Sequence, residues 1–188
     1  TSIGGVIQLL VGILSLRNHR YHPNRRLMEA ARAQGHRAML LHPARVYLTL
    51  TPKGFRVIHL GKAVLPEVVL PRVGSTIREY PLALVRHMEG MGIRMVNNSE
   101  AVERARNKFR VLQALARQGV PIPESCYASN ERNLAAAARN LGSRPFVIKT
   151  AQGRQGRGVF LAKDAGEALR LFQERPPALG QLVFKGKQ

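Results

Sequence analysis

Cysteine, tryptophan and long apolar runs are all scarce in this sequence, and each scarcity excludes something. A single cysteine, Cys126, excludes an internal disulfide framework and a cysteine-rich zinc site. Tryptophan is absent and aromatic residues make up 5% of the chain, which disfavours a nucleic-acid binder built on stacked rings. The apolar stretch from Val6 to Leu16 is too short to span a bilayer and lacks the charged start of a signal peptide. Together these features predict a cytoplasmic protein with no membrane partner.

Acidic residues are also few. The chain has 11 Asp and Glu against 30 Lys and Arg, a formal net charge of +19, and its only aspartate is Asp164. Up to residue 100 there are 14 basic and 5 acidic residues, and after it 16 and 6, so the excess is spread evenly. Such a field attracts polyanions, namely nucleotides, RNA or an acidic peptide. A basic proteome or a missing acidic portion explains the charge equally well, and no carboxylate cluster for a metal ion is expected.

Short apolar runs alternate with helical patterns through the first half of the chain. We expect strands at residues 11–16, 38–41, 67–70 and 93–96, helices at 25–34 and 82–91, and a hairpin of 46–50 with 55–60. The turn signal Thr51-Pro52-Lys53-Gly54 separates the two hairpin strands. Strands that alternate with helices predict an α/β fold with a mostly parallel sheet and right-handed crossovers.

Polar residues at Asn97-Asn98-Ser99 mark a boundary and open a new helical stretch. We therefore expect two domains, residues 1–97 and 98–188. In the second we expect helices at 107–118, 134–141 and 164–172, and strands at 125–128, 146–150, 158–162 and 181–184.

The strongest local signal is an apolar strand that ends in a lysine and is followed by a glycine-rich loop. Phe146-Val-Ile-Lys149 precedes Gly153-Arg-Gln-Gly156-Arg-Gly158. Glycines let backbone N–H groups approach phosphate oxygens, and Lys149 would add a positive charge. The loop returns to a strand, so it is neither a dinucleotide-binding loop nor a Walker A loop, both of which open a helix. A plain β-hairpin with a glycine loop is the structural alternative.

Several segments, taken in series, resemble the ATP-grasp family. They are Val96–Lys108, Leu115–Pro123, Val147–Lys149 and Gly153–Val159, preceded by Gly35-His36, Leu41-His42-Pro43 and Pro71-Arg72-Val73-Gly74. Their order and spacing resemble the RimK-like branch, ligases that add glutamate to the C-terminus of a ribosomal protein. The resemblance extends from Val11 to about residue 184. It implies an N-terminal, Rossmann-like pre-ATP-grasp domain and the first lobe of an ATP-grasp domain.

The resemblance also implies roles for particular residues, although it assigns no catalytic residue in this chain. Lys108 and Lys149 match lysines that contact ATP phosphates. The loop residues Gly153, Arg154, Gln155, Gly156 and Gly158 match the loop that covers them, and Gln181, Leu182 and Val183 match the hinge whose backbone binds adenine. Arg72 matches a position facing the acceptor substrate. The alternatives are a solvated helix lysine at Lys108 and an ordinary surface arginine at Arg72.

The chain departs from the family pattern at two places. Asn107 stands where the family has aspartate, a change expected to weaken the local helix cap or a salt bridge. ATP-grasp ligases also continue beyond the hinge with acidic and Asn ligands for Mg²⁺, whereas this sequence ends at Gln188. The resemblance therefore implies a C-terminally truncated ligase that lacks these magnesium ligands.

The function implied by the resemblance is ATP-dependent carboxylate–amine ligation through an acyl phosphate. Glutamate would be the donor. The acceptor would be the C-terminal carboxylate of a protein or peptide, for example of a ribosomal protein. The resemblance also implies a homo-oligomer. Three other interpretations of the function stay open. They are a non-catalytic remnant that binds nucleotide or the ribosome, a related ligase that joins an amino acid to a carrier protein or coenzyme, and an RNA-binding domain driven by charge.

Overall fold

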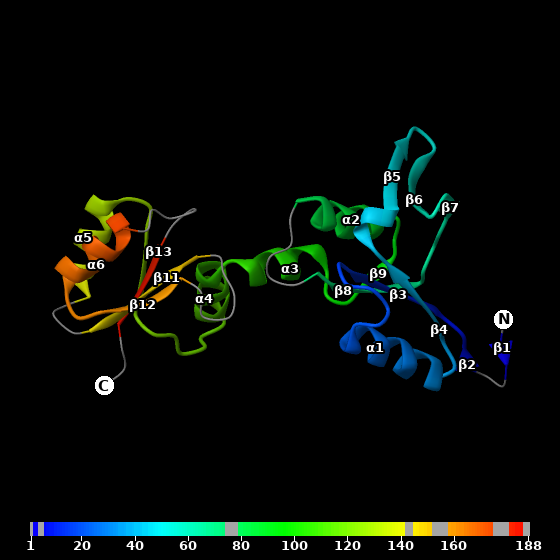
Figure 1. Ribbon diagram of the computed structural model, residues 1–188, viewed down its shortest axis with the longest axis horizontal. Coiled ribbons are helices and arrows are strands. Elements are labelled where there is room, and N and C mark those ends of the chain that lie inside the picture. Colours follow the sequence, from blue (N-terminus) through cyan, green and yellow to red (C-terminus); the bar gives the residue numbers. More distant parts are fainter. Residues whose placement is uncertain are drawn as a thin grey trace. The chain divides into compact units, whose positions relative to one another are not determined.

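The computed structural model describes residues 2–3, 6–73, 79–141, 145–151, 158–174 and 181–185 (Figure 1). The chain divides into two compact units, Thr1–Glu103 and Arg104–Gln188. Helix α3 (Ser99–Arg106) contains the division between them. Among the described residues, no helix is both long enough and apolar enough to cross a membrane.

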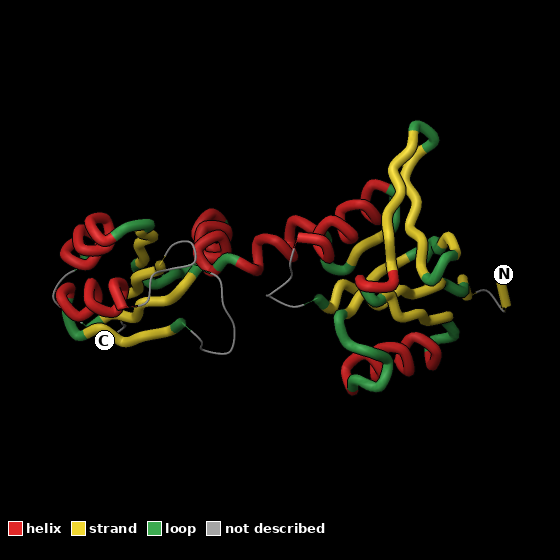
Figure 2. The backbone as a smooth tube through the Cα atoms, turned by 45° about the horizontal axis from the view of Figure 1, so that its top comes forward, coloured by secondary structure: helices red, strands yellow, loops and turns green. Residues whose placement is uncertain are grey.

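The N-terminal unit is built on a four-stranded parallel sheet, in the order β4-β3-β8-β9. Its strands are β3 (Leu10–Ser15), β4 (Arg37–Leu41), β8 (Val68–Arg72) and β9 (Arg94–Met95). Helix α1 (His22–Ala33) joins β3 to β4, and α2 (Glu79–Gly90) precedes β9. The two helices cover opposite faces of the sheet (Figures 1 and 2). The predicted α/β fold with a parallel sheet is confirmed.

The core of this unit explains why the sequences of its strands are mostly apolar. Ile13, Leu14, Leu41 and Val69 are fully buried, because helices cover both sides of the sheet. From α2, Met88 packs into the same core at 0% exposure. Because both faces of the sheet are covered, β3 is buried along nearly its whole length and lacks the polar alternation typical of a half-exposed strand.

A second, antiparallel sheet follows β4. The short 3-10 helix η1 (Pro43–Arg45) leads into β5 (Val46–Thr51), which pairs with β6 (Gly54–His59), and β6 pairs with β7 (Lys62–Ala63). The hairpin of β5 and β6 extends away from the rest of its unit (Figure 2). The hairpin prediction is confirmed. The short strands β1 (Ser2–Ile3) and β7 were not predicted, because two-residue strands carry no periodic signal. β2 (Val6–Ile7) lies at the start of the apolar stretch Val6–Leu16, which was expected to form one buried strand, but it pairs with β1 as a separate strand.

The C-terminal unit contains a four-stranded antiparallel sheet in the order β10-β13-β11-β12. Its strands are β10 (Ser125–Ala128), β11 (Phe146–Thr150), β12 (Val159–Ala162) and β13 (Gln181–Lys185). Helices α5 (Glu131–Asn140) and α6 (Ala165–Glu174) pack on one face, against Phe146 and Ile148, which are each 1% exposed. Helix α4 (Lys108–Arg117) lies on the other side of this sheet (Figure 1), where Phe109 stacks on Tyr127 with ring centroids 5.0 Å apart.

Asn107 caps the start of α4. Its side-chain oxygen accepts hydrogen bonds from the backbone N–H groups of Phe109, at 2.9 Å, and Arg110, at 3.2 Å. These are two of the donors that a helix start otherwise leaves unpaired. Asparagine therefore supplies the cap at this position, where a weaker cap was expected.

We expect Asn107→Ala to lower the free energy of unfolding of the C-terminal unit by about 1 kcal/mol, because it removes both acceptor contacts. Asn107→Asp keeps the acceptor and adds a negative charge at the helix start, so it should be neutral or slightly stabilising. Hydrogen exchange at the amides of α4 measures both effects. Equal losses of protection in the two variants would show that the cap is unimportant.

Candidate phosphate-binding site

Strand β11 places Lys149 on the sheet face that is turned away from α5 and α6. Side chains alternate along a strand, and Ile148 points into the core, so its neighbour Lys149 lies on the opposite face. Lys149 pairs in register with Val159 on one side and Leu182 on the other, and Leu182 pairs with Tyr127. The half-buried Lys149 is therefore held in the middle of the sheet, at the second-last position of its strand.

Lys108, the first residue of α4, is tied to the end of the same strand. Its backbone N–H donates to the carbonyl oxygen of Ala151 at 2.9 Å, and its Nζ donates to the carbonyl oxygen of Thr150 at 2.9 Å. Burial lowers the pKa of Lys108, and the nearby charge of Lys149 lowers this pKa further. The two predicted phosphate-binding lysines, which are 41 positions apart in the sequence, therefore lie close enough to repel each other.

This pair of lysines has the electrostatics of an anion site. Burial and the nearby positive charge of Lys149 disfavour the charged form of Lys108, as its lowered pKa shows. A phosphate group placed between them would remove that repulsion and gain charge-assisted hydrogen bonds. The residues present therefore fit the phosphates of a nucleotide.

Gly158 closes the glycine-rich loop against β11. Its carbonyl oxygen accepts a hydrogen bond from the N–H of Thr150 at 2.9 Å, and its φ of +74° is a conformation that glycine adopts without strain. A Cβ at this position would lie 2.6 Å from Oγ1 of Thr150. The end of the loop can therefore lie against the strand only because residue 158 has no side chain.

Thr150 is the residue of this site that the sequence reasoning missed. Its carbonyl oxygen accepts a hydrogen bond from Nζ of Lys108, and its N–H donates to the carbonyl oxygen of Gly158. Its side chain packs against Gly158. Its place directly after Lys149 was the available signal, because the last residue of a strand also borders the loop that follows.

The other predicted nucleotide contacts have different outcomes. Gly153, Arg154, Gln155 and Gly156 lie outside the described residues. The hinge segment Gln181–Val183 forms part of β13, whose backbone pairs with β10 on one side and β11 on the other. The structure thus brings Lys108, Lys149, Gly158 and the hinge strand together around β11, and adenine binding by the hinge stays a prediction.

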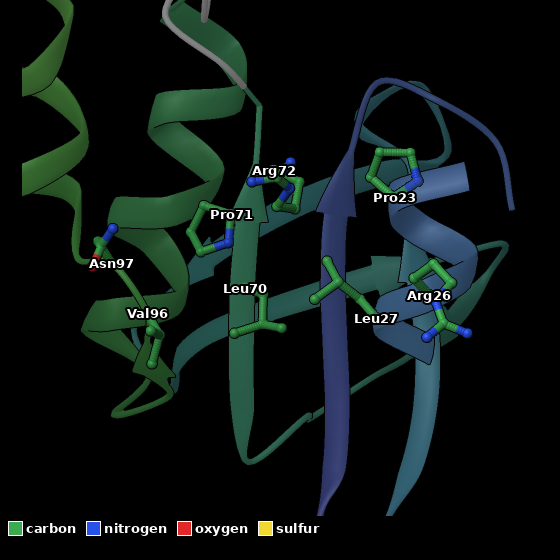
Figure 3. A pocket seen from close by; sticks show the side chains of 8 residues that line it. All are labelled: Pro23, Arg26, Leu27, Leu70, Pro71, Arg72, Val96 and Asn97. Atoms are coloured by element: carbon green, nitrogen blue, oxygen red, sulfur yellow. The ribbon is translucent and has the colours of Figure 1, made fainter. Parts of the chain in front are cut away.

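Arg72 belongs to the N-terminal unit and lines a pocket there. It is the exposed last residue of β8 and pairs in register with Ser15 at the end of β3. The pocket has a volume of about 410 Å³ and an apolar floor that includes Leu27 and Leu70 (Figure 3). Val96 lines it from the segment that follows β9. Arg26 also lines the pocket, and the two guanidinium groups beside these apolar side chains suit a ligand with an anionic group and an aliphatic part.

Neither metal nor thiol chemistry is supported by the described part of the chain. Within it, no group of three His, Cys, Asp or Glu side chains gathers to hold a metal ion, so these residues do not fit Mg²⁺. Burial raises the pKa of the Cys126 thiol, and the charge of Glu124 raises it further. A raised pKa keeps the thiol protonated at neutral pH, which suits a packing role rather than a nucleophilic one.

Two family descriptions match the chain, one for each half. Residues 9–102 match the RimK PreATP-grasp domain, and residues 105–179 match the RimK-like ATP-grasp domain. A probable alpha-L-glutamate ligase from Legionella pneumophila (strain Corby) is 37% identical over 164 residues, covering 86% of this chain and 54% of that protein. One from Stenotrophomonas maltophilia (strain K279a) is 38% identical over 167 residues, covering 85% and 57%. The chain thus spans about half the length of these curated relatives.

Solved structures with the same fold agree with these matches. The RimK domain protein ATP-grasp from Sphaerobacter thermophilus superposes with a TM-score of 0.70 at 25% identity, covering 95% of this chain and 64% of that chain. The ATP-grasp ligase PsnB, complexed with a minimal precursor, superposes with a TM-score of 0.67 at 17% identity, covering 96% and 64%. At this lower identity the second likeness concerns the fold alone.

Proposed function

This chain belongs to the RimK-like ATP-grasp family, and from that premise we propose that it forms the nucleotide-binding part of an ATP-dependent carboxylate–amine ligase. In the proposed reaction ATP phosphorylates an acceptor carboxylate and leaves as ADP. The amine of glutamate then attacks the acyl phosphate, which forms an amide and releases inorganic phosphate. The curated relatives are named probable alpha-L-glutamate ligases, which supports glutamate as the donor. The family resemblance found in the sequence is thereby confirmed.

One observation carries the proposal. Lys108 and Lys149, from a helix and a strand distant in sequence, meet at the end of β11 beside the glycine that closes the loop. An isolated hairpin with a surface lysine would not need a second lysine bound to the same strand end. This convergence favours the phosphate site over the plain hairpin that the sequence left open.

In this proposal the residues of the chain bind and orient the phosphates. Lys149, fixed by the sheet, meets the charge that develops on the transferred phosphoryl group, and Lys108, held by Thr150, meets it from the side of α4. Both charges are in place before the reaction, so little reorganisation is needed when the transition state forms. The proposed partners are ATP, glutamate and a protein or peptide C-terminal carboxylate; a cytoplasmic location and a homo-oligomer stay predictions.

The proposal is tested by calorimetric titration of ATP, with and without Mg²⁺, into the unaltered chain and Lys149→Gln. We expect the substitution to weaken ATP binding about tenfold, the effect of losing one charge-assisted contact. Lys163→Gln is the matched control, because it removes the same charge from an exposed position of the same unit, beyond β12. It should leave ATP affinity unchanged.

Two results would count against this assignment. Equal weakening in Lys149→Gln and Lys163→Gln would mean that ATP responds only to overall charge. An absence of ATP binding by the folded, unaltered chain would mean that these residues do not bind nucleotide by themselves. Glutamate-dependent ADP release by the chain would in turn contradict the non-catalytic alternative.

A further inference from the structure

A basic hollow, separate from the pocket of Arg72, lies at the carboxyl ends of β3 and β4. Its volume is about 680 Å³. The loop after β3 and the segment around η1 contribute the charged and ionisable side chains that line it, namely Arg17, His19, Arg20, His42 and Arg45. This volume lies within the range of ordinary ligand-binding sites.

The position of the basic hollow is one that α/β sheets use for binding. In open parallel sheets, ligands bind beyond the carboxyl ends of the strands, near the point where the strand order reverses. Here β4 lies on one side of β3 and β8 on the other, so the order reverses at β3, whose following loop lines the hollow. Arg72, at the end of β8, lies on the same edge of the sheet.

The basic hollow has no carboxylate among the residues that line it. None of its lining residues, all of which the structure describes, is an aspartate or glutamate. The ion pairs found in this unit lie elsewhere, from Glu29 to Arg25 and Arg26 and from Arg86 to Glu79 and Glu103. Three arginines gathered without a carboxylate repel one another, and an anionic ligand would relieve that repulsion.

Buried hydrogen bonds hold the loop after β3 in place. The side-chain amide of Asn24, which is 0% exposed, donates to the carbonyl oxygens of Arg17 and Asn18, each at 3.0 Å. It also lies 3.1 Å from Oγ of Ser15. The Arg17 guanidinium lies 5.9 Å from the centre of the Tyr21 ring, a cation–π distance. Arg17 and Arg20 therefore belong to a loop whose backbone is already held in place, so little backbone conformational entropy is lost when they bind.

His42 links the two segments that line the hollow. Its Nδ1 accepts a hydrogen bond from the N–H of Ala44 at 3.2 Å, so the ring proton resides on Nε2, which donates to the carbonyl oxygen of Leu16 at 3.2 Å. The ring thereby joins the end of β4 to the loop after β3. This link sets the spacing between Arg45, on η1, and Arg17.

We propose that the basic hollow binds the side-chain carboxylates of an acidic peptide, the segment preceding the acceptor carboxylate. The binding of an acidic peptide by the hollow does not depend on the proposed function; only the identification of that peptide as the acceptor rests on it. Guanidinium groups match carboxylates in planar, two-pronged hydrogen bonds. Free glutamate fits less well, because its ammonium group would find no carboxylate among the lining residues. RNA is disfavoured because no Phe, Tyr or Trp side chain lines the hollow as a platform for bases to stack on.

The test is fluorescence anisotropy of a labelled oligoglutamate peptide titrated with the chain in the absence of ATP. The pocket variant carries Arg17→Gln, Arg20→Gln and Arg45→Gln. The control variant carries Arg32→Gln, Arg37→Gln and Arg56→Gln, which remove the same charge from exposed positions of the same unit outside the hollow. We expect at least about tenfold weaker binding by the pocket variant and about threefold or less by the control.

Further arms separate the possible ligands and exclude misfolding. An oligoglutamine peptide should not bind, and free glutamate, inorganic phosphate and ATP should displace the peptide only at much higher concentrations. Three results would each overturn the proposal. The two triple variants could lose equal affinity for the peptide, or free glutamate could displace the peptide at peptide-like concentrations. Single-stranded RNA could also bind more tightly than the peptide and lose that binding in the pocket variant. Thermal unfolding shows whether both variants remain folded. Lysines at the three pocket positions should restore only part of the affinity, because they return the charge without the two-pronged guanidinium contacts. Because ATP is omitted, failure here is distinguishable from failure of the nucleotide site.

Discussion

Gly158→Ala is expected to destabilise the C-terminal unit by about 3 kcal/mol, from two separable causes. The first is backbone strain, because alanine at a φ of +74° enters a region that costs L-residues about 1 kcal/mol. The second is steric overlap. The new Cβ would lie 2.6 Å from Oγ1 and 2.9 Å from Cγ2 of Thr150, a branched side chain with little freedom to move. Hydrogen exchange at the amides of β11 and β12 measures the loss within this unit.

Two companion variants separate these causes. Gly119 has a φ of +70° in the same unit, with no atom within 4 Å of where a Cβ would be, so Gly119→Ala should show the backbone cost alone. In a Thr150→Ala background the closest contacts disappear, and Gly158→Ala should then cost little more than Gly119→Ala. Gly158→Ala and Gly119→Ala could instead lower the free energy of unfolding equally in the unaltered chain. That result would show that the Thr150 side chain moves aside and that its close packing against Gly158 does not matter.

The Gly158 contacts also change what the glycine-rich sequence means. From the sequence, its glycines were interpreted as sites where backbone N–H groups approach phosphates. At Gly158 the requirement comes from the protein itself, since the backbone turns with positive φ and lies against Thr150. The same strand end receives Lys108, so the packing of Gly158 and the position of that lysine share one residue.

Much of the fold could be predicted because its signals are local. The apolar runs of β3 and β11, the Ala-rich α5 and the turn between β5 and β6 are each encoded within a few neighbouring residues. The expected and observed elements differ mainly at their ends, as at α1, where the observed helix begins at His22 and the expected one at Arg25. Helix ends depend on caps and tertiary contacts, which periodicity does not reveal.

The parts of the site that could not be predicted depend on contacts between distant residues. The two lysines were identified through a family resemblance, and no local pattern indicates that Nζ of Lys108 donates to the carbonyl oxygen of Thr150. The basic hollow was equally hidden. Arg17 and Arg45 are separated by a helix and a strand, and the even distribution of charge along the chain concealed their convergence. Only the parallel register of β3 and β4 brings their following loops together.

Asn24→Asp should destabilise the N-terminal unit by about 3–5 kcal/mol at neutral pH, although the two side chains have nearly the same shape. Asn24 is fully buried, and its side-chain amide donates to the carbonyl oxygens of Arg17 and Asn18. An aspartate would place carboxylate oxygens against these carbonyl oxygens, losing the donors and burying a charge without a partner. The loss should appear as faster hydrogen exchange at the amides of β3, β4 and β8.

Asn18→Asp is the matched control, because it makes the same chemical change in the loop that Asn24 holds. Asn18 is exposed, and its side-chain oxygen accepts from the N–H of Arg20 at 3.0 Å, a role that a carboxylate fills equally well. It should therefore change stability by less than about 0.5 kcal/mol. If Asn24 served only to fill space, both aspartate variants would be tolerated. A large loss at position 24 alone would show that donation by Asn24 fixes the loop from which Arg17 and Arg20 project into the basic hollow.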